Sequence, residues 1–360
     1  MKKTKFYNCH LEKNAKMVEF AGYEMPIQYT SIIAEHKAVR ESVGVFDVSH
    51  MGEIFIKGEN ALNFIQHITV NNAANLQSGK VQYSAMCYEN GGIVDDLLVY
   101  KINDLEYMLV VNGANKEKDY EWIIKNNSFN AEVIDESDDY SLLAVQGPNS
   151  RKVIEKVFKT EIDIDYYTFI KSELFGAEII VSRTGYTGEL GYELYFKGDD
   201  NLAVKIWNLI FEMGEEYNIS PTGLGCRDSL RLEMGYCLYG NDINESTTTL
   251  EAGLGWITKL KKGDFIGRDI LVNQKENGIK KKLMPIIFND RAFPRTGYEI
   301  QKNGISVGKI TSGTVSPMLE KPIALGYVNI DLAIEGTDVD VIIRNKPFSA
   351  NITKLPFVNK

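Results

Sequence analysis

Apolar and polar residues follow two different rhythms along this chain. Up to about residue 278, segments with helical spacing alternate with segments in which every second residue is apolar. The remaining residues form short strand-like runs broken by turns. This arrangement predicts an α+β body followed by an all-β carboxyl-terminal domain.

Two segments of the body have the spacing of amphipathic helices. Ser31 can cap the first helix, and Gly44 is expected to end it. The apolar face of this helix consists of Ile32, His36, Val39 and Val43. The second helix is expected over residues 201–216, with Leu202, Ile206, Leu209, Ile210 and Met213 on its apolar face.

The carboxyl-terminal region contains six runs that read as strands. Asn303 and Gly304 separate two of these runs, and this pair favours a tight hairpin because both residues accept a positive φ at low cost. The runs are residues 283–288, 297–301, 305–311, 323–330, 337–343 and 348–353.

Length, charge and cysteine usage narrow the class of protein. A chain of 360 residues with 44% hydrophobic and 25% charged residues is expected to form two or three domains. The basic amino end is not followed by an apolar stretch, and no run of 18 apolar residues occurs, so neither a secretory signal nor a membrane helix is predicted. A net charge of -9 opposes binding to nucleic acid. The four cysteines form no CxxC pair, which favours a reducing cytoplasm without a zinc site.

Two aspartates interrupt an apolar strand pattern after the turn at Asn90-Gly91. Asp95 and Asp96 project to opposite faces of the strand, and each lies among apolar residues. A carboxylate in such a place either gains hydrogen-bond partners or has its pKa raised, and both outcomes are common at sites that bind polar ligands or transfer protons. Alternatively, one of the two aspartates caps a neighbouring loop. Strand alternation alone does not decide between a site role and a capping role.

Residues 182–193 combine three glycines, two tyrosines and two glutamates. Glycines let the backbone approach a flat ligand, Tyr186 offers a stacking face, and Glu193 can accept paired hydrogen bonds from an amino-pyrimidinone edge. The alternative is a glycine-rich hairpin with tyrosines on its surface.

Residues 223–233 read as a glycine-led helix start with Arg227 in its first turn. An arginine in the first turn interacts unfavourably with the helix dipole, so Arg227 is a candidate to bind a ligand carboxylate. Alternatively, it pairs with Asp228 or Glu233.

The four histidines are not spaced as paired metal ligands, and only His50, in a short polar turn, suggests a role in shaping a site. Signatures of serine hydrolases, phosphate-binding loops and zinc proteases are missing.

Several motifs in the same order closely resemble the T-protein family, the aminomethyltransferases of the glycine cleavage system. The resemblance covers nearly the whole chain. The matching stretches are residues 16–26, 44–52, 91–97, 182–193, 223–233, 254–256 and 308–313.

The resemblance implies both a fold and a reaction. It implies a three-domain cloverleaf around a central folate channel, with domain 1 at residues 1–48 and 134–242, domain 2 at 49–133 and 243–278, and a barrel-like domain at 279–360. The implied donor is an aminomethyl group on the dihydrolipoyl arm of the H-protein. Loss of ammonia gives an electrophilic carbon that tetrahydrofolate captures at its 5-position nitrogen, and ring closure gives 5,10-methylenetetrahydrofolate. Tetrahydrofolate is the acceptor substrate, and no metal is implied.

The same resemblance assigns roles to single residues. Asp96, rather than Asp95, matches the essential acid, Glu193 matches the residue that grips the pterin edge, and Arg227 matches the residue that steadies the bound folate. The matched pocket-lining positions are Tyr186, Tyr83, Asn112, Tyr236, Met51 and Trp256.

Two positions depart from the family pattern, since Thr249 stands where proline is expected and Asn14 where glycine is usual.

Two other activities remain open for this fold: a folate-dependent demethylase and a non-catalytic folate-binding protein. Demethylating relatives carry a large flavin domain, for which this chain has no room. The related factor for iron–sulfur maintenance carries a Lys-Gly-Cys-Tyr motif that is missing here.

Overall fold

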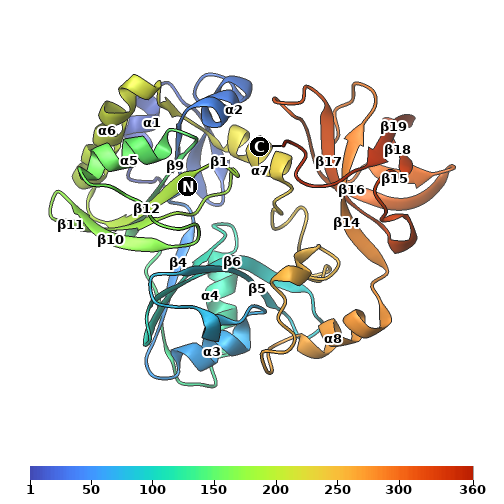
Figure 1. Ribbon diagram of the computed structural model, residues 1–360, viewed down its shortest axis with the longest axis horizontal. Helices are drawn as coiled ribbons and strands as arrows, with labels where there is room; N and C mark the ends of the chain where they lie inside the picture. The colour runs from blue at the N-terminus through green and yellow to red at the C-terminus, as the bar shows by residue number, and fades with distance from the viewer. Residues whose placement is uncertain (360) are drawn as a thin grey trace. The chain divides into compact units, whose positions relative to one another are not determined.

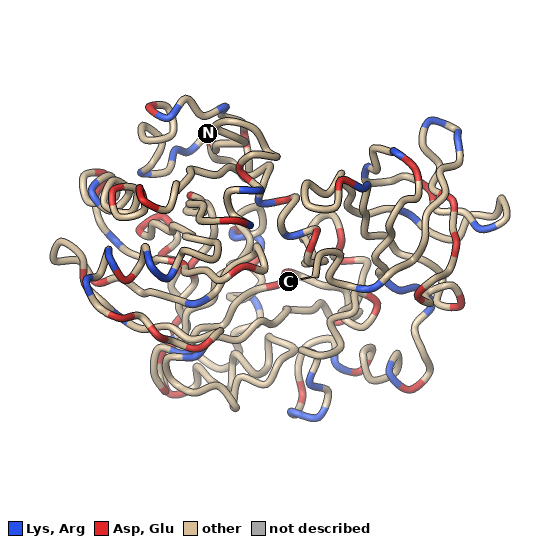
Figure 2. Tube along the Cα trace, turned by 45° about the horizontal axis from the view of Figure 1, so that its top comes forward, with Lys and Arg blue, Asp and Glu red and all other residues tan. Residues whose placement is uncertain are grey.

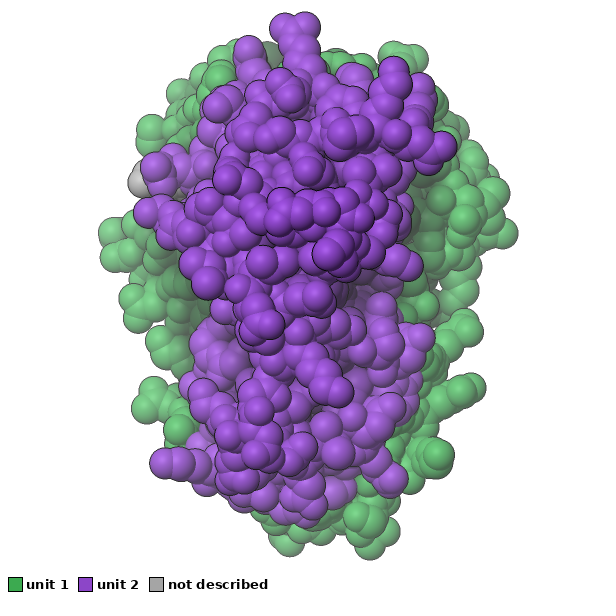
Figure 3. All heavy atoms as spheres, turned by 90° about the vertical axis from the view of Figure 1, so that its right-hand side faces the viewer, with its two compact units in different colours: residues 1–65, 73–83, 97–228 green, residues 66–72, 84–96, 229–360 purple. Residues whose placement is uncertain are grey.

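The computed structural model describes residues 1–359 (Figure 1), which form two compact units (Figure 3). Unit 1 comprises residues 1–65, 73–83 and 97–228, and unit 2 comprises residues 66–72, 84–96 and the described residues from 229 onward. The predicted site residues are therefore distributed over two units, with Glu193 in unit 1 and Asp96 in unit 2.

Unit 1 contains a six-stranded sheet in the order β10-β11-β12-β9-β3-β13. All its pairings are antiparallel except that of β13 with β3. Its strands are β3 (Gly44–Asp47), β9 (Tyr140–Gln146), β10 (Phe169–Leu174), β11 (Ala177–Ser182), β12 (Gly191–Lys197) and β13 (Ser220–Pro221).

Helices bury one face of this sheet. Val153 and Val157 of α5 and Ile206 and Ile210 of α6 are fully or almost fully buried in a core that also contains Trp207. Each helix thus directs a stripe of apolar residues to the sheet, which is the main source of its stability. The helices of this layer are α1 (Tyr7–Glu12), α2 (Ile32–Glu41), α5 (Ser150–Phe158) and α6 (Asp200–Gly214).

The two predicted helices exist, and both end earlier than expected. The Ser31 hydroxyl accepts a hydrogen bond from the Ala34 amide at 3.2 Å, which confirms the cap. However, α2 ends at Glu41, because Gly44 pairs with Gln146 in the sheet and the chain must leave the helix before it. The expected helix over residues 201–216 is α6, which ends at Gly214 and continues into a 3-10 turn.

A second sheet has the order β5-β6-β7-β4-β8. Asp95 on β6 is fully buried and Asp96 is half-buried, in agreement with their expected placement on opposite faces. Its strands are β4 (Gly52–Lys57), β5 (Val81–Cys87), β6 (Ile93–Asn103), β7 (Glu106–Val111) and β8 (Glu132–Asp135). The other elements in the first 140 residues are the hairpin of β1 (Lys16–Phe20) and β2 (Tyr23–Gln28), the helices α3 (Ala61–Ile68) and α4 (Lys116–Lys125), and the 3-10 turn η1 (Ala73–Asn75).

The six carboxyl-terminal strands close into a barrel, in the order β14-β17-β16-β15-β18-β19. Each predicted strand run overlaps one barrel strand, and Asn303 and Gly304 have φ values of 53° and 78° in the hairpin between β15 and β16. The strands are β14 (Lys281–Phe288), β15 (Glu299–Lys302), β16 (Ile305–Val315), β17 (Pro322–Asn329), β18 (Asp338–Ile343) and β19 (Lys346–Ile352). The α+β class with a barrel-like carboxyl-terminal domain is therefore confirmed.

Unit 2 also contains α8 (Arg268–Asn277) and the 3-10 turn η3 (Leu254–Trp256) before the barrel, and the 3-10 turn η4 (Ile330–Leu332) between β17 and β18. Helix α7 (Leu224–Met234) contributes its last residues to this unit. Acidic and basic residues are interspersed along the chain (Figure 2). Within residues 1–359, no helix combines the length and the apolar composition needed to cross a membrane.

The departure at Asn14 is accommodated by its backbone. Asn14 has a φ of 57°, a left-handed conformation that asparagine tolerates better than most residues. The loop therefore keeps the geometry for which a glycine is otherwise suited. Thr249 at the second departure is fully buried and its hydroxyl accepts a hydrogen bond from Thr258 at 2.9 Å.

Candidate functional site

Glu193 lies on β12 and is 7% exposed. Its Oε2 atom accepts a short hydrogen bond from the Thr184 hydroxyl and a second from the Tyr195 hydroxyl at 3.2 Å. Burial raises the pKa of the Glu193 carboxyl, whereas these two hydrogen bonds and the Arg227 cation oppose the shift. Both of these hydrogen bonds end on the same carboxyl oxygen, Oε2.

A cluster of hydroxyl groups holds the two donors in place. The Tyr100 hydroxyl lies 3.0 Å from the hydroxyls of Ser182 and Tyr195 and 3.2 Å from that of Thr184. These four residues come from β6, β11, β12 and the loop after β11. Because their hydroxyls bond to one another, the Glu193 side chain is held in one orientation.

Arg227 belongs to the first turn of α7, and its guanidinium lies over the Tyr186 ring, 4.7 Å from the ring centroid. Burial lowers the pKa of Arg227, whereas Tyr186 and Glu193 oppose this shift. An arginine remains a cation under these conditions. Glu233, one alternative partner expected for Arg227, instead accepts hydrogen bonds from the Ser316 hydroxyl at 2.5 Å and the Met318 amide at 3.2 Å.

His50 is buried in unit 1, and its Nδ1 atom has no hydrogen-bond partner among the described residues. Burial, followed by the Arg227 cation, lowers the pKa of His50 to about 4. The ring is therefore neutral at pH 7, which avoids a second cation beside Arg227. The predicted pocket residues Met51, Tyr83 and Asn112 are half-buried and belong to the same unit.

Glu53 was missed by the sequence analysis. This β4 residue is 1% exposed, and neither carboxyl oxygen has a hydrogen-bond partner among the described residues. Burial raises the pKa of Glu53 well above its ordinary value; Lys116 opposes the shift, and Asp135 and Glu193 add to it. Strand alternation could have identified it, because Glu53 lies on the same strand face as Phe55 and this pattern predicts that the carboxyl is buried.

Unit 2 contains the other predicted site residues. Asp96 and Tyr236 are half-buried, and Trp256 is 63% exposed. Burial raises the pKa of the Cys237 thiol, and the carboxylates of Asp242 and Asp96 raise it further. The loop that contains Tyr236 and Cys237 reaches the strand that carries Asp96, because the Tyr239 hydroxyl donates to the Ile93 carbonyl at 3.1 Å.

Each unit thus brings part of the predicted set together. Unit 1 holds the buried Glu193 together with the half-buried pair of Arg227 and Tyr186, and unit 2 joins the strand of Asp96 to the loop that follows Tyr236. Among residues 1–359, no three His, Cys, Asp or Glu side chains are placed to hold a metal ion together.

The chain matches known proteins over its whole length. Residues 6–262 match the GCVT N-terminal domain, and residues 281–359 match the glycine cleavage T-protein C-terminal barrel domain. Aminomethyltransferase from Halothermothrix orenii is 50% identical over 359 residues, which cover 99% of this chain and 100% of that protein. Aminomethyltransferase from Flavobacterium psychrophilum is also 50% identical, with 100% of both chains covered.

A crystal structure gives the same result for the fold. Glycine cleavage system aminomethyltransferase T from Bartonella henselae superposes with a TM-score of 0.92 and 31% identity, covering 99% of this chain and 98% of that one. Both domains, the relatives and the superposed structure agree. The chain therefore belongs to the glycine cleavage T-protein family, whose members are aminomethyltransferases.

Proposed function

We propose that this protein transfers a one-carbon unit from an aminomethyl-dihydrolipoyl group on the H-protein to tetrahydrofolate, and that it releases ammonia and 5,10-methylenetetrahydrofolate. The observation that carries the proposal is full-length membership in the aminomethyltransferase family. The buried carboxylate of Glu193, whose two hydrogen bonds end on one oxygen, supports a polar heterocycle as the acceptor.

In this proposal unit 1 binds the pterin. The amino-pyrimidinone edge carries adjacent N–H donors, and Glu193 accepts from them. Tyr186 lies beside the flat ring, and the Arg227 cation stabilises the anionic folate. Met51, Tyr83 and Asn112 of the same unit line the pocket.

Asp96 is the catalytic acid of the proposal, and Tyr236 and Trp256 of unit 2 are its other folate-lining residues. The new bonds join the transferred carbon to two folate nitrogens, and the bonds from that carbon to sulfur and to the amine break. Of the two protons lost by the folate nitrogens, one goes to the sulfur and one to the departing ammonia. Asp96 assists this proton movement near the 10-position nitrogen, and holding the two reactants in line contributes up to roughly 7–11 kcal/mol.

The wider setting belongs to the same proposal. The fold is a three-domain cloverleaf around a folate channel, divided at residues 1–48 with 134–242, 49–133 with 243–278, and 279–360. The protein works in the cytoplasm with the H-protein as its partner, and its reaction uses no metal.

Replacement of Asp96 tests the central assignment. The Asp96→Asn variant is expected to bind tetrahydrofolate with little change but to release almost no ammonia from aminomethyl-loaded H-protein, because the amide cannot take up a proton. Ammonia and methylenetetrahydrofolate are measured together. Asp104→Asn, at an exposed carboxylate beyond the end of β6, is the matched control and should turn over like the parent. Equal ammonia release by Asp96→Asn and the parent removes Asp96 from its role.

The assay also separates the alternatives. A non-catalytic folate-binding protein binds tetrahydrofolate but gives no ammonia in the parent form. A folate-dependent demethylase gives methylenetetrahydrofolate from an N-methyl amine rather than from loaded H-protein. Either result in the parent protein contradicts the proposed reaction.

A further inference from the structure

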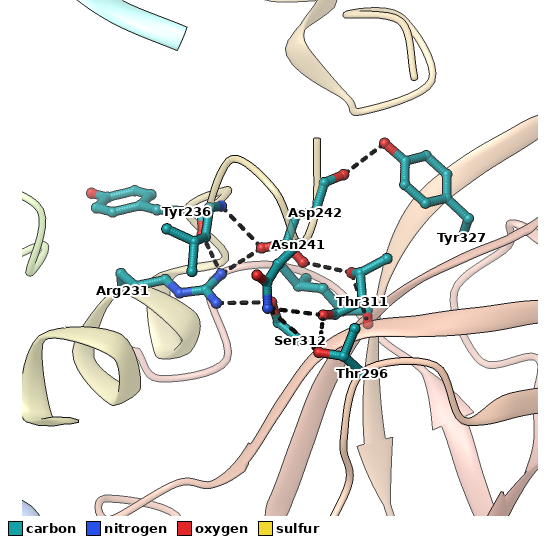
Figure 4. Close-up of polar contacts among 10 residues, drawn as sticks. Arg231, Tyr236, Asn241, Asp242, Thr296, Thr311, Ser312 and Tyr327 are labelled. Atoms are coloured by element: carbon teal, nitrogen blue, oxygen red, sulfur yellow. Dashed lines mark hydrogen bonds and ion pairs between the residues drawn. The ribbon is translucent and has the colours of Figure 1, made fainter. Parts of the chain in front are cut away.

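A buried ion pair links α7 to the loop that follows it. Arg231 is 1% exposed and Asp242 is 0% exposed, and Nη1 of Arg231 lies 2.6 Å from Oδ2 of Asp242 (Figure 4). Buried ion pairs contribute little net stability compared with apolar residues of the same size. We therefore consider which parts of the structure the ion pair holds in place.

Three hydrogen bonds tie this ion pair to the barrel (Figure 4). The Thr311 hydroxyl donates to Oδ1 of Asp242 at 2.5 Å, and the Tyr327 hydroxyl donates to the Asp242 carbonyl at 2.9 Å. Nη2 of Arg231 donates to the Ser312 hydroxyl at 2.8 Å. The three barrel residues come from the adjacent strands β16 and β17, so a closed and rigid element holds the pair.

The same ion pair fixes the loop of residues 236–248. Nη1 of Arg231 donates to the Tyr236 carbonyl at 2.9 Å, and the Leu238 amide donates to Oδ2 of Asp242 at 3.0 Å. Both ends of the ion pair are thus bonded to the loop backbone. The loop cannot shift without breaking bonds to buried charges, which is costly.

This loop in turn holds the start of β6, the strand that carries Asp96. The Tyr239 hydroxyl donates to the Ile93 carbonyl at 3.1 Å, and the Ile93 amide donates to the carbonyls of Asn244 and Thr247, each at 3.1 Å. A Cβ atom on Gly92 would lie 1.9 Å from the Glu245 carbonyl oxygen, so only glycine permits this approach.

We infer that the barrel positions Asp96 through the Arg231–Asp242 pair and the loop of residues 236–248, which makes Arg231, Asp242 and Tyr239 positioning residues for the reaction. The inference rests on the proposed function, because Asp96 is its catalytic acid. Asp96 lies three residues beyond Ile93, or about 10 Å along an extended strand. A shift of the strand start is transmitted to Asp96, and a misplacement of about 1 Å can cost up to about 100-fold in rate.

Two single hydroxyl deletions test the path without exposing a buried charge. Tyr239→Phe removes the bond from the loop to β6, and Tyr327→Phe removes one bond from the barrel to Asp242. Tyr298→Phe, at a half-buried barrel tyrosine outside this network, is the matched control. Ammonia release gives kcat and the KM for tetrahydrofolate, and thermal denaturation gives Tm.

Both variants are expected to lower kcat by about threefold to tenfold with KM within about twofold of the parent, because positioning of the acid changes and pterin binding does not. The double variant should lose less than the product of the single losses, because the two bonds act on one path. The acid limb of the kcat–pH profile should shift in Tyr239→Phe, because the surroundings of Asp96 change, and should stay in place in Tyr298→Phe. Thr311→Val should behave like Tyr327→Phe, and Thr311→Ser should restore kcat.

Three outcomes overturn the inference. One is a kcat within twofold of the parent in both variants, and another is an equal loss in Tyr298→Phe. The third is a rise in KM that parallels a loss of Tm, which indicates general loosening of the fold. If the parent is active and Asp96→Asn is inactive, these outcomes count against the positioning path alone. Absence of turnover in the parent counts against the proposed function.

Discussion

Glu193 in unit 1 and Asp242 in unit 2 are both buried carboxyl groups, and the protein surrounds them in opposite ways. Two neutral hydroxyls donate to one oxygen of Glu193, and burial raises its pKa. Asp242 has the Arg231 cation at 2.6 Å, and donors reach both of its oxygens. Asp242 is therefore bonded to the fold through both carboxyl oxygens, whereas the Thr184 and Tyr195 hydroxyls share one oxygen of Glu193.

The comparison shows how burial alone fails to identify a binding site. Glu53 is as buried as Asp242, yet neither of its oxygens has a hydrogen-bond partner among the described residues. A buried acid without partners keeps its proton, because the charged form loses its hydration. Saturation of the oxygens, rather than depth, distinguishes a structural carboxylate from one that serves another purpose.

The largest effect is expected when Asp242 is removed. Asp242→Ala leaves the Arg231 cation buried without its counter-ion, and we expect a loss of about 3–5 kcal/mol in the free energy of unfolding. Urea denaturation measures it. The double replacement Arg231→Met with Asp242→Leu should recover much of the loss, since no charge is then left unpaired. If Asp242→Ala lowers the free energy of unfolding by less than about 1 kcal/mol, Asp242 does not have the structural role that distinguishes it from Glu193.

Removal of Glu193 should affect binding instead of folding. Glu193→Ala is expected to weaken tetrahydrofolate binding by about 1–3 kcal/mol, because pterin donors lose their acceptor. Calorimetric titration gives the dissociation constant. Binding by the parent should also be lost as pH falls through the raised pKa of Glu193, since the protonated carboxyl accepts less well. Glu178→Ala, at a surface residue paired with Lys171, is the control. An unchanged dissociation constant in Glu193→Ala excludes the pterin assignment.

The smallest effect concerns Glu53 and is seen only as a function of pH. The pKa of Glu53 is raised well above its ordinary value of 4.5 in the folded protein, so the stability of the parent is expected to fall as pH rises above 4.5. Glu53→Gln removes the titration, and its advantage over the parent should grow from pH 4 to pH 8. Denaturation at both pH values measures the difference. A constant difference indicates that Glu53 is ionised in the folded state.

Local sequence patterns predicted the elements that local forces build. The six barrel strands and the Asn303-Gly304 hairpin follow from alternation and from turn chemistry, which act over a few residues. The expected end of α2 was wrong because pairing of Gly44 with Gln146, about a hundred residues away in the sequence, decides where the helix ends. The helical spacing of Val43 gave no indication of that pairing.

The sequence by itself determined the α+β class, the all-β carboxyl-terminal domain and, through its ordered motifs, membership in the T-protein family. Only the tertiary structure decided that Thr184 and Tyr195 share one oxygen of Glu193, that Glu53 is left with no partner among the described residues, and that Asp242 joins Arg231 to Thr311. The physical reason is range: periodicity reports which face of an element is buried, whereas strand order and loop paths determine which distant polar groups meet on that face.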